Sequence, residues 1–149
     1  MKTHILLVRH GKSVAADLGI VQGQGLDIPL TDEGRRQARK TGEFLRSCSL
    51  NKIYTSKAIR ATETASIIRE SHPHVPYEEL SMLNERSKGV AEGMRQDEFN
   101  QKYPLVIKQW EQGIDARPEG GESFEDVHHR VVPLFDRHLA GSLPGPPPL

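Results

Sequence analysis

Apolar residues alternate between short runs and helical stripes along the chain, and this pattern predicts strands that alternate with helices. The run Ile-Leu-Leu-Val at residues 5–8 is typical of a strand that is buried on both faces of a parallel sheet. Further strands are expected at 52–55 and within 77–83. Apolar positions at helical spacing predict one helix over about 32–48 and another between Ser56 and Pro73. Together these elements predict an α/β fold with a mainly parallel sheet.

Polar residues that begin helices are recognisable at three places. Thr31 precedes acidic residues and a helical stripe, as an N-cap does, and Ser56 is placed to cap the next helix. Ser123 and Asp126 have the spacing of a capping box, which predicts that a helix over about 124–139 begins there.

Length and composition describe one ordinary domain. The chain has 149 residues, so we expect one domain over residues 1–140 and a tail over 141–149 that holds four Pro and two Gly. Two short helices are expected around Pro104, within about 95–112. Lys plus Arg equals Asp plus Glu at 20 each, which argues against nucleic-acid and anionic-membrane partners.

The single cysteine, Cys48, excludes an intramolecular disulfide and fits a reducing compartment. The apolar run near the N-terminus is shorter than a secretory signal needs, and no run approaches the length of a membrane span. We therefore expect a cytoplasmic protein.

Three segments carry candidate chemistry. Arg9 and His10 follow the expected strand at 5–8, and ligands of parallel sheets bind outside the carboxyl ends of the strands. Arg60 lies in the first turn of a helix that follows a strand, where free N–H groups attract anions. Glu85 lies in a loop after a strand. Taken singly, each has an ordinary alternative: a surface turn, an Arg60–Glu63 pair on a helix, and a solvated loop carboxylate.

Taken together, the segments resemble the histidine phosphatase superfamily, also called phosphoglycerate mutase-like. The resemblance implies that family's three-layer sandwich with a mainly parallel sheet. The matching stretches, in chain order, are LLVRHGKS at 6–13, QGQGLDIPLTDEGRRQA at 22–38, IYTSKAIRATETA at 53–65, LNERSKGVAEG at 83–93 and EGGESFEDVHHRV at 119–131.

The resemblance implies a role for each candidate residue. His10 is then the nucleophile that forms a phosphohistidine, Arg9 and Arg60 hold the phosphoryl oxygens, and Glu85 is the general acid and base. No metal and no organic cofactor is required. Three further residues border the pocket and are expected to contact substrate: Ser13, Gln22 and Gly23.

The chain departs from the family at its C-terminal end. Family members carry a second catalytic His in a His-Gly pair after a later strand, and no such strand follows the 124–139 helix here. We therefore expect a C-terminally truncated form of the fold. His138 is a weak candidate for the missing histidine. In the family the later strand lies beside the one expected at 5–8, so an open apolar edge should invite a homodimer or a folded-back tail.

Two substitutions near His10 bear on the reaction. Lys12 stands where the family often has Glu, and Ala16 stands where mutases have Asn. We therefore expect a phosphatase that hydrolyses small phosphorylated metabolites through a phosphohistidine. The alternatives are a cofactor-dependent phosphoglycerate mutase and, because the second His is absent, a weakly active or inactive phosphate-binding remnant.

Overall fold

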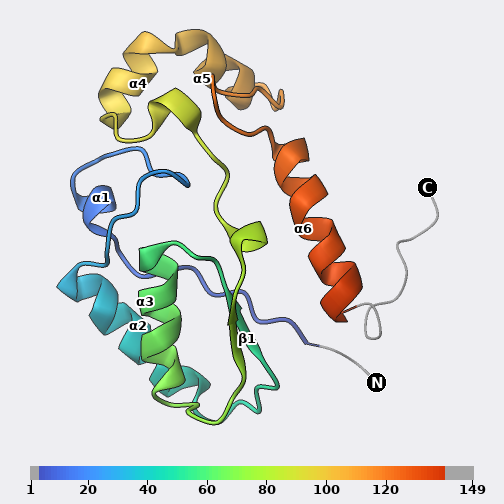
Figure 1. Cartoon of the computed structure of the whole chain (residues 1–149). Helices are drawn as coiled ribbons and strands as arrows, with labels where there is room; N and C mark the ends of the chain where they lie inside the picture. Colours follow the sequence, from blue (N-terminus) through green and yellow to red (C-terminus); the bar gives the residue numbers. More distant parts are fainter. Residues whose placement is uncertain (1–3, 140–149) are drawn as a thin grey trace.

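A small parallel sheet lies beside a pair of helices in the computed structural model, which describes residues 4–139 and their side chains as far as residue 135 (Figure 1). Strand β1 (Ile53–Thr55) pairs with β2 (Tyr77–Glu79), with Ile53 opposite Tyr77. Helix α3 (Ile59–Arg69) connects the two strands. The strands expected at 52–55 and within 77–83 are therefore confirmed in shortened form, as is a parallel sheet.

Helix α2 (Asp32–Leu45) runs beside α3 (Figure 1). Its N-cap is confirmed, because the Thr31 hydroxyl accepts a 3.0 Å hydrogen bond from the Gly34 N–H. The helix ends three residues before the expected position. Gly42 allows the two helices to approach closely, since a Cβ there would lie 3.3 Å from the Ile68 Cα.

The predicted cap at Ser56 is wrong. Helix α3 begins after Ala58, whose side chain makes no capping bond. Side chains from distant loops satisfy the first amides instead: Asn84 Oδ1 accepts from Lys57 N–H at 3.0 Å, and Asp27 Oδ1 accepts from Ile59 N–H at 2.6 Å. Tertiary contacts therefore replace the local cap.

A small apolar cluster lies under the two short helices expected around Pro104, which are confirmed as α4 (Gln96–Lys102) and α5 (Pro104–Glu111). Phe99 is buried at its centre, and its ring lies 5.9 Å from that of Trp110. Trp110 therefore packs in the protein, and its indole N–H donates to the Ala116 carbonyl at 2.8 Å. The other members of the cluster are Val21, Ala91, Met94, Tyr103, Val106 and Ile107.

Helix α6 (Phe124–Leu139) begins at the expected capping box, which is confirmed. Ser123 N–H donates to Asp126 Oδ2 at 2.7 Å, and Asp126 N–H donates to Ser123 Oγ at 3.1 Å. Arg130 of the same helix donates to the Met82 carbonyl at 2.6 Å and so joins α6 to the turn before Glu85. The remaining helical turns are α1 (Val14–Asp17), η1 (Ser81–Leu83) and η2 (Gly89–Ala91).

The strand expected at residues 5–8 is absent, and this prediction is wrong. Figure 1 draws the segment as coil, and its four side chains are exposed, Leu7 to 89%. A strand needs N–H and C=O partners on a neighbouring strand, and within residues 4–139 the sheet consists of β1 and β2 alone. The apolar pattern of residues 5–8 leads to burial only where a neighbouring strand pairs with them.

Two other sequence-based expectations concern the C-terminal tail and membrane-spanning helices. The tail at 141–149 lies outside the described residues, as does the side chain of His138. Across the described part of the chain, no helix has the length and apolar character to cross a bilayer.

We predict that Leu7→Glu suppresses self-association without destabilising the fold. Surface substitutions usually change the free energy of unfolding by less than about 0.5 kcal/mol. A core substitution serves as the comparison: Phe99→Ala should lower the free energy of unfolding by about 3–5 kcal/mol, because it empties a core site. Sedimentation at several concentrations should show association of the unsubstituted protein and a monomeric Leu7→Glu variant. Thermal unfolding should give the same midpoint, within about 2 °C, for the unsubstituted protein and for Leu7→Glu. Equal association of the two proteins would exclude residues 5–8 as the contact surface.

Candidate active site

Close backbone contacts fix the turn that carries His10. A Cβ on Gly11 would overlap the Gly34 carbonyl, and a Cβ on Gly34 would overlap the Lys12 carbonyl. The Gly11 N–H also donates to Thr64 Oγ1 on α3 at 3.1 Å. Residues 11–12 therefore lie directly against the first turn of α2, and only glycine permits this approach at positions 11 and 34.

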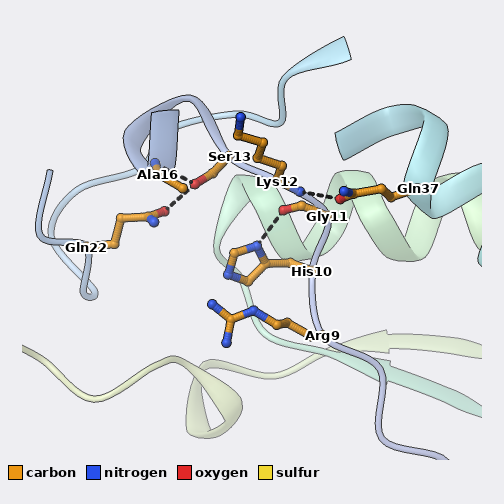
Figure 2. Close-up of a pocket in the computed structure, with 8 residues that line it drawn as sticks. All are labelled: Arg9, His10, Gly11, Lys12, Ser13, Ala16, Gln22 and Gln37. Atoms are coloured by element: carbon orange, nitrogen blue, oxygen red, sulfur yellow. Dashed lines mark hydrogen bonds between the residues drawn. The ribbon is translucent and has the colours of Figure 1, made fainter. Parts of the chain in front are cut away.

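The His10 ring has a defined tautomer. Its Nδ1 lies 2.7 Å from the Gly11 carbonyl oxygen (Figure 2). A carbonyl only accepts hydrogen bonds, so Nδ1 carries the proton in the neutral ring and Nε2 carries the lone pair. The geometry therefore assigns Nε2 as the nitrogen that can attack an electrophile.

His10 opens into a pocket of about 290 Å³ (Figure 2). The Ser13 hydroxyl donates to Gln22 Oε1 at 2.9 Å and accepts from the Ala16 N–H at 3.2 Å, so both polar residues are held on the pocket wall. Of the described residues that line it, one is a histidine. The lining residues are Arg9, His10, Gly11, Lys12, Ser13, Ala16, Gln22 and Gln37.

Arg60 is the buried cation of the site. Its side chain is 2% exposed, and its Nη2 donates to the Gly23 carbonyl at 3.2 Å and to Glu85 Oε2 at 2.9 Å. Its Nη1 is buried and has no hydrogen-bond partner. Burying an unpaired donor is costly, so an acceptor from a bound anion would stabilise this arrangement.

The local pair that the sequence allowed for Arg60 does not form. Glu63 instead accepts from the Leu30 N–H at 2.6 Å and from Arg35 Nη2 at 3.0 Å. The hydrogen bond from Arg35 to Glu63 and the negative charge of Glu63 raise the pKa of Arg35. Arg60 is left to contact residues that lie far from it in the sequence.

Glu85 is the carboxylate that contacts Arg60. Its side chain is 42% exposed, so the carboxylate reaches both the buried Arg60 and solvent. Arg130 Nη2 donates to the Glu85 carbonyl at 3.1 Å and holds the backbone. A carboxylate with a fixed backbone and an accessible side chain suits proton transfer to a bound molecule.

Two further cations flank Glu85. The Arg86 guanidinium is buried and lies 4.6 Å from the Trp110 ring centroid and 4.2 Å from that of Phe124. Lys88 Nζ lies 5.3 Å from the Trp110 ring. Burial lowers the pKa of both groups, and the charge of Arg86 lowers that of Lys88 further. The loop after Glu85 therefore carries positive charge in a partly apolar setting.

A second group of carboxylates joins the loops of the site and was not identified from the sequence. Glu122 Oε2 accepts from the Ser87 N–H at 2.9 Å and from Gln24 Nε2 at 2.6 Å. Its hydrogen bonds with Arg130 are the main reason that its pKa is lowered. Glu92 makes similar contacts. Neither was found from the sequence, because each also binds a backbone N–H that lies 35 or more residues away along the chain.

The structure thus brings the expected residues into two connected sets. Arg9, His10, Ser13 and Gln22 line one pocket, and Arg60 directly contacts Gly23 and Glu85. Thr64 connects the sets, because its hydroxyl binds the Gly11 N–H and donates to the Arg60 carbonyl at 2.7 Å. Among the described residues, no group of three or more His, Cys, Asp or Glu side chains could hold a metal ion.

The sequence model of the histidine phosphatase superfamily (branch 1) matches residues 5–144. Over 142 residues the chain is 36% identical to a 2,3-bisphosphoglycerate-dependent phosphoglycerate mutase 2 of Gloeobacter violaceus, covering 93% of this chain and 64% of the relative. It is 33% identical to fructose-2,6-bisphosphatase TIGAR B of Danio rerio, covering 91% of this chain and 54% of the relative. The chain spans less than two thirds of the length of these relatives.

Solved structures give the same result for the fold. Mycobacterial hydrolase 1 superposes with a TM-score of 0.81 at 29% identity, over 88% of this chain and 62% of that one. Mycobacterial glucosyl-3-phosphoglycerate phosphatase in complex with VO3 superposes with a TM-score of 0.81 at 29% identity, over 89% and 62%. The expected α/β, phosphoglycerate mutase-like fold is therefore confirmed. The chain belongs to the histidine phosphatase superfamily.

Proposed function

We propose that the protein is a phosphatase that hydrolyses small phosphorylated metabolites through a phosphohistidine on His10. The observation that carries this proposal is the hydrogen bond from His10 Nδ1 to the Gly11 carbonyl, which leaves the Nε2 lone pair for attack. The unpaired, buried Nη1 of Arg60 supports it, since a phosphoryl oxygen is a suitable acceptor. Cys48 is a free thiol, in keeping with the reducing cytoplasm, where we place the reaction.

The first step transfers the phosphoryl group to the protein. His10 Nε2 attacks the phosphorus, the P–N bond forms, and the bond from phosphorus to the ester oxygen breaks. Glu85 gives its proton to the departing oxygen, so that an alcohol leaves. Arg9 and Arg60 bind the non-bridging oxygens, where negative charge is concentrated in the transition state.

The second step releases phosphate. Glu85, now ionised, takes a proton from a water molecule whose oxygen attacks the phosphorus, and the P–N bond breaks. The Arg60–Glu85 contact suits this double role, because it holds the carboxylate beside the guanidinium whose free Nη1 is proposed to bind the phosphoryl group.

A phosphoglycerate mutase is the second candidate, because several relatives carry that name. Ala16 argues for the phosphatase, since it lines the pocket with a methyl group at the position where mutases have an Asn. A weakly active, phosphate-binding protein is the third candidate. It is favoured by the single histidine among the described pocket residues, because removing one donor to transition-state charge typically costs about 10²–10³ in rate.

Product analysis should separate these three candidates. We expect release of inorganic phosphate from 3-phosphoglycerate without conversion to 2-phosphoglycerate, even after priming with a bisphosphate. A panel of sugar phosphates, phosphoglycerates and nucleotides would then rank substrates. Isomerisation without phosphate release would establish the mutase. Phosphate binding without turnover of any substrate would establish the third candidate.

Acid-quench labelling should detect the intermediate on His10. After mixing with radiolabelled substrate, we expect acid-labile label on the unsubstituted protein and none on His10→Ala. His129→Ala is the matched control, because His129 is an exposed histidine on α6 that pairs with Glu125. Label that survives in His10→Ala would contradict the mechanism.

Arg60→Lys should lower kcat/KM by about 10²–10³ while the protein stays folded. Lysine keeps the charge but is a point charge that cannot reproduce the fork with which Arg60 reaches Gly23, Glu85 and a phosphoryl oxygen. Arg36→Lys is the control, because Arg36 is an exposed residue of α2 that pairs with Glu33. Steady-state kinetics with p-nitrophenyl phosphate would measure both, and equal activities would remove Arg60 from the site.

A further inference from the structure

Two irregular loops meet at the Arg60 guanidinium. Gly23 offers its carbonyl and Glu85 its carboxylate to the same nitrogen, Nη2, at 3.2 and 2.9 Å. Neither residue lies in a helix or a strand. The direction of Arg60, and hence of its unpaired Nη1, therefore depends on what holds the two loops against each other.

One carboxylate joins both loops. Glu92 Oε1 accepts from the Gln24 N–H at 3.1 Å, from the Lys88 N–H at 2.8 Å and from the Ser87 hydroxyl at 3.1 Å. Its Oε2 accepts from the Gly25 N–H at 2.5 Å. Two donors thus come from the loop of Gly23 and two from the loop of Glu85. Hydrogen bonds to a charged group are stronger than neutral ones.

The glycines at 23 and 25 are explained by the same carboxylate. A Cβ on Gly23 would overlap Glu92 Oε1 and lie 2.9 Å from its Cγ, and a Cβ on Gly25 would lie 2.7 Å from Oε2. Neither glycine has a positive φ, so neither is required by its backbone conformation. The carboxylate is tied by four hydrogen bonds and cannot move aside without losing them.

We propose that Glu92 is a positioning residue of the phosphoryl site. It acts through Gly23 and Glu85, whose oxygens it holds at the distance at which both bind Arg60 Nη2, and it thereby aims Nη1 at the phosphoryl oxygen. The inference rests on the proposed function, since it assigns Arg60 to the phosphoryl group. It also explains why the chain has glycine at positions 23 and 25, which lie 69 and 67 residues before Glu92.

The first measurement compares Glu92→Gln with the unsubstituted full chain. Glutamine keeps the size and one accepting oxygen, but its amide meets the Gly25 N–H as a second donor. We expect the dissociation constant of inorganic vanadate, a phosphate analogue, to rise about tenfold in calorimetry, which corresponds to the loss of about one hydrogen bond. Glu98→Gln removes the same charge from an exposed position of α4 and should bind vanadate as the unsubstituted protein does.

A destabilised control separates positioning from general support of the fold. Leu45→Val weakens the buried C-terminal end of α2, which packs near Ile68 at the end of α3 opposite to Arg60. At a temperature at which each variant is folded, it should leave vanadate affinity unchanged even if its unfolding midpoint falls as far as that of Glu92→Gln. Equal losses of affinity in the two variants would overturn the proposal.

A double-mutant cycle tests the contact itself. Gly23→Ala in the otherwise unsubstituted chain should weaken vanadate binding about tenfold, because the new methyl group displaces the carboxylate. In a Glu92→Ala background the same methyl group enters vacated space, so Gly23→Ala should then cost less than about twofold. Additive effects would overturn the proposal, because they would show that the two positions do not act through each other.

The outcomes also separate this proposal from the function on which it rests. An unsubstituted protein that binds vanadate and forms the His10 intermediate, with variants that bind equally well, leaves the phosphatase intact and removes the role of Glu92. An unsubstituted protein that binds no vanadate and forms no phosphohistidine removes both. Coupled losses in the cycle with normal binding by Glu98→Gln support both.

Discussion

The burial of one positive charge organises this molecule. A guanidinium that is 2% exposed must be surrounded by acceptors, because an isolated buried charge is far less stable than a solvated one. The acceptors of Arg60 are Gly23 and Glu85, which lie in two loops far apart in the sequence. The helix that carries Arg60 is joined through Thr64 to the turn after His10. Satisfying Arg60 therefore fixes the positions of the segments that make the pocket. Its Nη1 is the buried donor that keeps no hydrogen-bond partner.

Features that depend on neighbouring residues could be predicted from the sequence, and features that depend on distant ones could not. The caps at Thr31 and at Ser123 with Asp126 formed as expected, because cap and partner are three residues apart. Two predictions were wrong for the same kind of reason. Residues 5–8 form no strand, because a strand needs a second strand as its neighbour. Ser56 is not the cap of α3, because distant side chains bind the amides at the start of that helix.

The same distinction applies to the candidate site. Arg9, His10, Arg60 and Glu85 were predicted from three short motifs and from the family resemblance, and not from a strand at residues 5–8, which does not form. The sequence did not show that Arg60 pairs with Glu85 and not with Glu63. Both carboxylates are plausible partners in the sequence, and the burial of Arg60 between the loops decides between them. Relatives with this fold include mutases and phosphatases. The fold alone therefore does not decide between the two reactions, which depend on the side chains of the site.

The two-stranded sheet has a consequence for the order in which the molecule acquires its parts. The strands and α3 form a continuous stretch of the chain, residues 53–79, whose contacts can close early because little loop entropy opposes them. The site closes across much longer separations: 53 residues for Gly11 with Thr64 and 68 for Gln24 with Glu92. A chain that has formed this stretch during folding is therefore still without the contacts that join the loops around His10 and Arg60. On gentle heating the same long-range contacts should be the first to open, so that the loops around Arg60 separate while the helical signal persists.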